Sequence, residues 1–253
     1  MIKSNNRTRL KKLLVFCATA LFLTAITGGT ASASGSLSNV VTTLFGESTQ
    51  TIDIVILLTV LTLLPSIVIM MTGFTRIVIV LSFIRNALGM QQTPPNQVII
   101  GLALFLTLFV MAPVVTAVYE DAYVPYTNGE IAQDEFFDRA MAPTRDFMLR
   151  QTEPSDLNFF IGLSGNEYAT PEELPNTVLI PAFMTSEIKL AFKIGFFIFI
   201  PFIVVDMVVA STLMAMGMMM LPPAMISLPF KILLFVFIDG WQMIIGTLVQ
   251  SFG

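Results

Sequence analysis

The chain has 253 residues, a mean hydropathy of +0.82 and only 12% charged residues, whereas a soluble globular domain has about 25%. This composition indicates an integral membrane protein, or one that buries nearly all of its surface against partners. Basic residues cluster only near the N-terminus, so nucleic-acid binding is not expected. The sequence contains no histidine and one cysteine, Cys17, which leaves almost no material for metal binding or thiol catalysis. No cofactor is therefore expected.

Residues 1–33 have the organisation of a cleavable secretory signal peptide. A basic stretch precedes a short apolar run, and the small-residue site Ala31-Ser32-Ala33 follows it. We predict cleavage after Ala33, and the alternative is an uncleaved first anchor. Residues 34–51 are small and polar, and they are predicted to form a flexible lead that starts on the outer face of the membrane.

Residues 52–119 are predicted to form a first helical hairpin. Its first apolar run, 52–88, would be roughly 55 Å long as a straight helix, against a hydrocarbon core near ~30 Å. The run must therefore protrude or bend, with Pro65 as the expected kink and Gly73 as a second weak point. Gly89 is placed to end the helix as its cap.

A turn at residues 90–97 joins this run to a second apolar run at 98–119. The region from Arg76 to the end of the turn also contains Arg85 and has no acidic residue. The positive-inside rule places it on the cytoplasmic side, which agrees with an N-terminus outside.

Residues 120–185 are acidic and rich in proline and glycine, and they are predicted to form a small periplasmic insert. Within the insert, residues 134–151 have the pattern of an amphipathic helix, which Pro143 is expected to interrupt. We expect this insert to be ordered by packing on a partner.

Residues 186–253 are predicted to form a second helical hairpin, from apolar runs at 188–221 and 232–252. The predicted fold is therefore all-α, with about four apolar helical segments after the signal peptide. A methionine-rich loop joins the last two runs, and its key residues are Met216, Gly217, Met218, Met219, Met220, Pro222 and Pro223.

The methionines of this loop allow three interpretations. They can be flexible core filler, or their unbranched side chains can close mechanically around irregular surfaces. Thioethers can also bind Cu(I), which would indicate a copper or small-solute transporter, although copper routes usually add histidine or cysteine. Gly217 permits an irregular backbone, while Pro222 and Pro223 stop the helix.

Six charged side chains flank the loop: Glu187, Lys189, Lys193, Asp206, Lys231 and Asp239. Charges in apolar helices are costly, so we expect each acid to pair with a lysine. The alternative is an intramembrane aspartyl protease that uses the two aspartates as a catalytic pair. Lys189 and Lys193 share a helix face and repel, so acids of the insert or of another subunit should lie opposite them.

Three segments carry a resemblance to a known family: PAFMTSEIKLAFKIG at 181–195, MGMMMLPP at 216–223 and PFKILLFVFIDGW at 229–241. Together they resemble the FliP/SctR family of type III secretion export-gate proteins. The resemblance extends over nearly the whole chain, and it includes the signal peptide and the acidic insert.

The resemblance implies a non-enzymatic export-gate subunit in the bacterial inner membrane, at the flagellar basal body, with much of the chain on the periplasmic side. It implies a pentameric, helical ring that includes FliQ and FliR, contacts other export apparatus proteins and passes unfolded flagellar subunits. Met216, Met218, Met219 and Met220 would line the pore as a gasket. On this interpretation the six charged residues form pairs that set the register of the ring.

Overall fold

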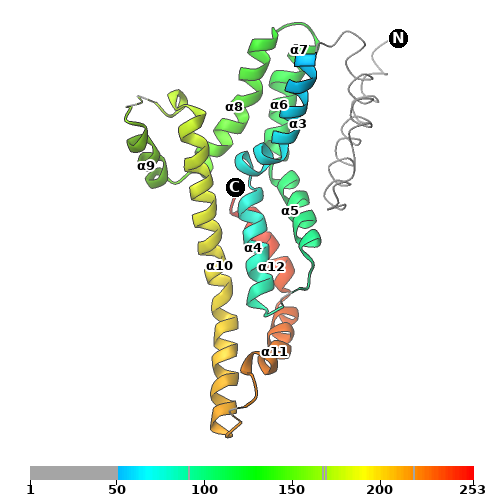
Figure 1. Ribbon diagram of the computed structural model, residues 1–253, viewed down its shortest axis with the longest axis vertical. Helices are drawn as coiled ribbons and strands as arrows, with labels where there is room; N and C mark the ends of the chain where they lie inside the picture. Colours follow the sequence, from blue (N-terminus) through cyan, green and yellow to red (C-terminus); the bar gives the residue numbers. More distant parts are fainter. Residues whose placement is uncertain (1–50, 91, 167, 169, 219) are drawn as a thin grey trace, which may run out of the picture. The chain divides into compact units, whose positions relative to one another are not determined.

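The computed structural model describes residues 51–90, 92–166, 168, 170–218 and 220–253, and every regular element in these ranges is a helix (Figure 1). The prediction of an all-α protein is confirmed at this level. The predicted signal peptide, with Ala31 and Ala33, lies outside the described residues, as does the predicted lead up to residue 50. The chain divides into two units, 1–63 and 64–253, and apart from the beginning of the first described helix the features discussed below lie in the second.

The first apolar run is broken at Gly73 rather than at Pro65. Helix α3 spans Thr51–Met71 and contains Pro65, and α4 spans Phe74–Ala87. A Cβ atom at Gly73 would lie 2.5 Å from the ring of Phe252, so this position accepts only glycine without rearrangement. The predicted weak point at Gly73 is confirmed as the break between the two helices, whereas α3 continues through Pro65 without interruption.

Helix α4 ends as predicted at Gly89. This glycine has φ +77°, its N–H donates to the carbonyl of Asn86, and the N–H of Met90 donates to that of Arg85. The two bonds form a Schellman motif, which requires a left-handed residue at the position of Gly89.

The second apolar run is divided into short helices. Helix α5 spans Asn96–Val110 and α6 spans Ala112–Val118, and the chain bends by 55° between them. A π-helical turn, η1, covers Tyr119–Tyr123, and α7 covers Val124–Thr127.

Helices α8 (Gln133–Gln151) and α9 (Pro154–Ser164), and the 3-10 turn η2 (Pro171–Glu173), lie in the predicted insert. Helix α8 continues through Pro143, so the predicted interruption there is wrong. Its residues Phe147 and Met148 are buried in a cluster with Phe183 of the next long helix. This packing stabilises the helix against the local cost of the proline.

Helix α10 spans Asn176–Ala215, α11 spans Pro223–Phe237 and α12 spans Gly240–Gln250. Helix α10 begins inside the predicted insert, about three turns before the apolar run suggested. At 40 residues it is about 60 Å long, twice the thickness of a hydrocarbon core.

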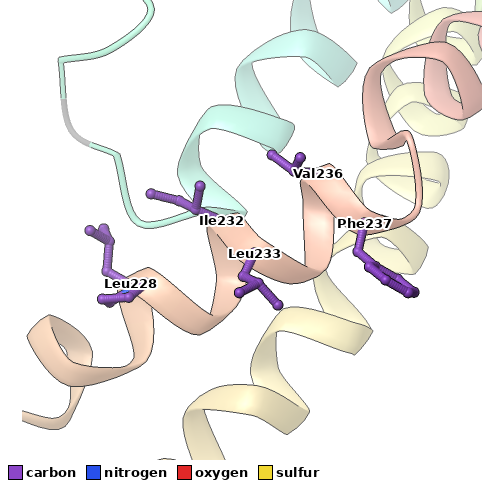
Figure 2. A pocket seen from close by; sticks show the side chains of 6 residues that line it. Leu228, Ile232, Leu233, Val236 and Phe237 are labelled. Carbon is purple, nitrogen blue, oxygen red and sulfur yellow. The ribbon is translucent and has the colours of Figure 1, made fainter.

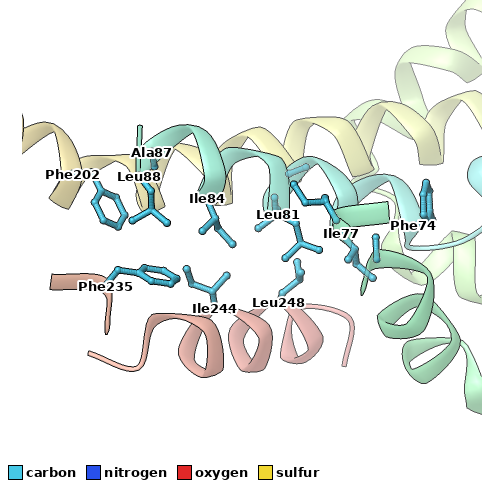
Figure 3. Close-up of a cluster of buried hydrophobic side chains, with 14 residues drawn as sticks. Phe74, Ile77, Leu81, Ile84, Ala87, Leu88, Phe202, Phe235, Ile244 and Leu248 are labelled. Carbon is cyan, nitrogen blue, oxygen red and sulfur yellow. The ribbon is translucent and has the colours of Figure 1, made fainter. Parts of the chain in front are cut away.

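The main core lies where α4 packs between α10 and α12. Figure 3 shows Ile77, Leu81 and Ile84 of α4 facing Ile244 and Leu248 of α12. On the α10 side, a glycine allows close approach, because a Cβ at position 195 would lie 2.6 Å from the ring of the α4 phenylalanine at position 83.

The described residues contain one helix, α10, that is long and apolar enough to cross a membrane. The number rises to four if each of three bent pairs counts as one span: Leu61–Met71 with α4, α5 with Ala112–Thr127, and α11 with α12. This agrees with the predicted number of about four apolar segments, and it adds that three of them are broken helices.

Candidate functional site

The methionine-rich loop joins α10 to α11 through a defined turn. Gly217 has φ +75°, its N–H donates to the carbonyl of Met214, and the N–H of Met218 donates to that of Leu213, each at 3.0 Å. This is a second Schellman motif, so Gly217 ends α10 in the same way that Gly89 ends α4. Pro222 caps the start of α11, whose first residue is Pro223.

The methionine side chains of this loop are directed outward. Met216 is 60% exposed, Met218 44% and Met220 99%. Met219, the remaining predicted gasket residue, lies outside the described residues. Apolar side chains this exposed at the tip of a hairpin gain nothing for the fold of one copy, so core filler does not describe them.

A charged contact joins the two helices about three helical turns from this loop. Lys231 of α11 donates to Asp206 of α10 at 2.6 Å, and the hydroxyl of Ser227 donates to the other oxygen of the same carboxylate at 2.6 Å. Lys231 and Ser227 are buried, whereas the carboxylate is 41% exposed. The contact therefore ties α11 to α10 behind the loop.

Glu187 of α10 forms a buried ion pair with Arg76 of α4, and both residues are 0% exposed. The guanidinium donates from Nε to one carboxylate oxygen at 3.0 Å and from a terminal nitrogen to the other. Its remaining N–H groups reach Gln151 at 2.9 Å and the backbone oxygen of Ser251 at 2.8 Å. The hydroxyl of Ser251 accepts a fifth bond at 3.1 Å. All five donors of this arginine are therefore satisfied, as a buried guanidinium requires.

The same arginine also joins the C-terminus to the helices. Its Cζ lies 3.9 Å from the centre of the Phe252 ring, and Gln151 of α8 donates to the backbone oxygen of that phenylalanine at 3.0 Å. Sequence reasoning did not select Arg76 as a site residue. Its partner is 111 positions away, so no local spacing reveals the pair.

This contact conflicts with one part of the predicted topology. The sequence interpretation placed Arg76 on the cytoplasmic side, whereas Glu187 directly follows the predicted periplasmic insert at residues 120–185. The two assignments cannot both be correct, since the two side chains are in contact. The positive-inside rule concerns charges in exposed loops, and a fully buried, paired arginine is not such a signal.

Lys189 is placed beside the acidic segment before α10. Its ammonium lies 2.5 Å from Glu153 and 3.4 Å from Asp156, and Ser186 donates to the latter carboxylate at 2.7 Å. Acids of the predicted insert therefore lie opposite this lysine.

Lys193 and Asp239 form no ion pair with any described residue. Both residues are exposed. Asp239 lies between α11 and α12 in the left-handed region, with φ 49° and ψ 47°, and its side chain does not cap α12. The two predicted protease aspartates are therefore in different settings, one ion-paired and the other exposed.

These features define a class: a membrane-type helical protein that presents an exposed methionine loop and holds its helices together with ion pairs. Within the described residues, no group of three histidine, cysteine, aspartate or glutamate side chains could hold a metal ion. Residues 57–248 match the sequence model of the FliP family. The chain belongs to the FliP family, and the resemblance carried by its motifs is confirmed.

Several curated relatives share most of their length with this chain, and each is a flagellar biosynthetic protein FliP. The protein of Pectobacterium carotovorum subsp. carotovorum is 56% identical over 209 residues, which cover 82% of this chain and 81% of the relative. That of Bacillus subtilis (strain 168) is 52% identical over 204 residues, covering 80% and 92%. That of Caulobacter vibrioides is 47% identical over 244 residues, covering 96% and 92%.

Proposed function

We propose that this chain is a non-enzymatic component of the flagellar type III protein export gate, and that its methionine loop closes the channel. Membership of the FliP family and the names of the relatives support the flagellar setting. The observation that carries the mechanism is the exposed loop at the hairpin tip, held by Gly217 and two prolines.

Methionine suits a closure of this kind because of its chemistry. Unfolded flagellar subunits present every type of side chain, so the closing surface must adapt rather than match one shape. An unbranched thioether side chain can repack around irregular partners. The Schellman turn and the proline cap fix the base of the loop, so the adaptable part is confined to its tip.

The proposal includes an assembly in the inner membrane. Several copies, five on the family resemblance, form a helical ring with FliQ and FliR, and the loops meet around one channel. Much of the chain, including the acidic residues 120–185, then lies on the periplasmic side with other export apparatus proteins. Helix α10, about twice as long as a bilayer is thick, supports this position, because a large part of it must find protein rather than lipid.

The geometry favours this function over the two alternatives. Asp206 is bonded to Lys231 and Ser227, so its carboxylate is already engaged in a structural contact. Copper routes usually add histidine or cysteine to their thioethers, and the part of the chain that the structure describes contains neither.

Substitution of the whole loop tests the proposal. With Met216, Met218, Met219 and Met220 all changed to leucine, we expect export and closure to remain close to those of the original protein, because leucine has a similar volume. With all four changed to alanine, we expect ion leak across the membrane to rise by about tenfold or more, since the shorter side chains would leave the closed channel incompletely filled. The measurements are secreted flagellar subunits and membrane conductance.

The exposed Met243 on α12 provides a matched control. Its change to alanine should leave conductance unaltered. A leucine loop that abolishes export while the protein still assembles would contradict mechanical closure and support a metal-binding role for the sulfur atoms.

A further inference from the structure

Two charges in the α10–α12 region remain without an ion pair among the described residues, and they have opposite signs. The other four charged side chains flanking the loop all pair within the chain: Glu187 pairs with α4, Lys189 pairs with the acidic segment before α10, and Asp206 pairs with Lys231. Only Lys193 and Asp239 stay exposed without an ionic partner in this part of the chain.

Lys193 lies in an exposed apolar face of α10. Phe196, Phe197 and Ile200 follow at helical spacings of three, four and seven residues, and all three are exposed. Residues at these spacings share one face of a helix. This face therefore carries a single cation within a row of large apolar side chains.

Asp239 adjoins a second exposed apolar face, on α11. Figure 2 shows an apolar hollow on this helix lined by residues that include Ile232, Leu233, Val236 and Phe237. Phe237 is 85% exposed and lies two positions before the aspartate. A single exposed anion therefore follows the end of this helix.

The two faces are both apolar, and they carry opposite charges. We infer that the α10 face of one copy docks on the α11 face of the next copy, with Lys193 paired to Asp239 across the contact. The inference rests on the proposed function, in which several copies form a ring. A charge in an apolar, membrane-type face is expensive without a partner, and a second copy supplies the opposite charge to each.

The contact also has the right symmetry and register. Two different patches joined head to tail form a heterologous interface, which generates a ring or helix rather than a closed dimer. With Lys193 at Asp239, the phenylalanines after the lysine run along the hollow that precedes the aspartate. A lipid phosphate, in contrast, would satisfy the lysine and leave the aspartate unpaired.

Cross-linking between differently tagged copies tests the contact. In a Cys17→Ser background, which removes the single cysteine, one copy carries Lys193→Cys and the other Asp239→Cys. A short bismaleimide added to the assembled export complex is expected to give a dimer that contains both tags. Mixed copies carrying Phe105→Cys, an exposed α5 position, and Asp239→Cys should not cross-link.

Charge reversal gives an independent measurement. Lys193→Glu or Asp239→Lys alone should lower the amount of large detergent-extracted complex by about tenfold. This factor corresponds to a loss of ~1.4 kcal/mol in the free energy of association. The two reversals combined should restore it to within about twofold of the original amount. Arg139→Glu, which breaks an exposed pair on α8, should have little effect.

The outcomes separate this inference from the proposed function. An intact large complex that gives no mixed-tag dimer overturns the contact but leaves the export gate standing. A different result would assign Lys193 to a lipid phosphate and overturn the contact: the cysteine pair gives no mixed-tag dimer, and the Lys193→Glu protein copurifies with less anionic phospholipid. If the unsubstituted chain, produced together with its partner proteins and extracted in detergent, is found only as a monomer, the proposed function itself fails.

Discussion

Replacing Glu187 with alanine is expected to destabilise the fold by about 3–5 kcal/mol, the range for breaking a buried ion pair from one side. The guanidinium of Arg76 would stay buried with two of its donors unsatisfied. Typical domains are stable by only about 5–15 kcal/mol, so we expect most of the folded protein to be lost. The measurements are the yield in membranes and the unfolding midpoint in detergent.

Two variants control this experiment. Glu135→Ala breaks an exposed pair on α8 and should cost less than about 1 kcal/mol. Arg76→Met combined with Glu187→Leu removes both charges and should recover part of the loss, since apolar replacement of a buried pair is often tolerated. An unchanged unfolding midpoint for Glu187→Ala alone would show that this contact does not hold α4 to α10.

Replacing Lys231 with alanine is expected to cost about 2–4 kcal/mol, because Asp206 would lose its cation in an apolar helix hairpin. Only the hydroxyl of Ser227 would remain on the carboxylate. The hairpin that presents the methionine loop should loosen, and both the amount of assembled complex and subunit export should fall. Size analysis of the detergent-extracted complex measures the first effect directly.

Asp206→Asn distinguishes this role from catalysis. In the ion-pair account, the single change lowers assembly, and a second change, Lys231→Gln, restores it by removing the unpaired ammonium. A protease aspartate would behave differently: Asp206→Asn would leave assembly intact and abolish peptide cleavage, with no recovery in the double variant.

Sequence patterns predicted the features that depend on local chemistry. The end of α4 at Gly89 follows from the backbone freedom of glycine after an apolar run. The methionine loop between two helices was visible because Gly217, Pro222 and Pro223 each act on the backbone within a few residues. The all-α class followed from the composition and from the lengths of the apolar runs.

Features that depend on distant parts of the chain could not be predicted in this way. Gly73 was predicted as a weak point, but its contact with the ring of Phe252, which only the folded chain brings near, was not. Helix α8 tolerates Pro143 because Phe147 and Met148 are buried against other helices. The partner of Glu187 lies 111 residues away, and the positive-inside rule had assigned that partner to the cytoplasmic side, away from the predicted periplasmic insert that precedes Glu187.

The charged residues also divide into groups that the sequence could not separate. Glu187, Lys189, Asp206 and Lys231 make contacts within one copy, so they act first on the fold. Lys193 and Asp239 remain for contacts between copies. The sequence analysis assigned the register of a ring to all six charged residues. We now propose this role only for Lys193 and Asp239.

A cysteine at Met220 tests the central claim most directly, because this fully exposed side chain should meet its counterparts if the loops close one channel. In a Cys17→Ser background, mild oxidation of the assembled complex carrying Met220→Cys is expected to give covalent dimers, whereas Phe105→Cys on α5 gives none. An intact complex in which Met220→Cys stays entirely monomeric would show that the loops do not converge, and it would contradict the gate.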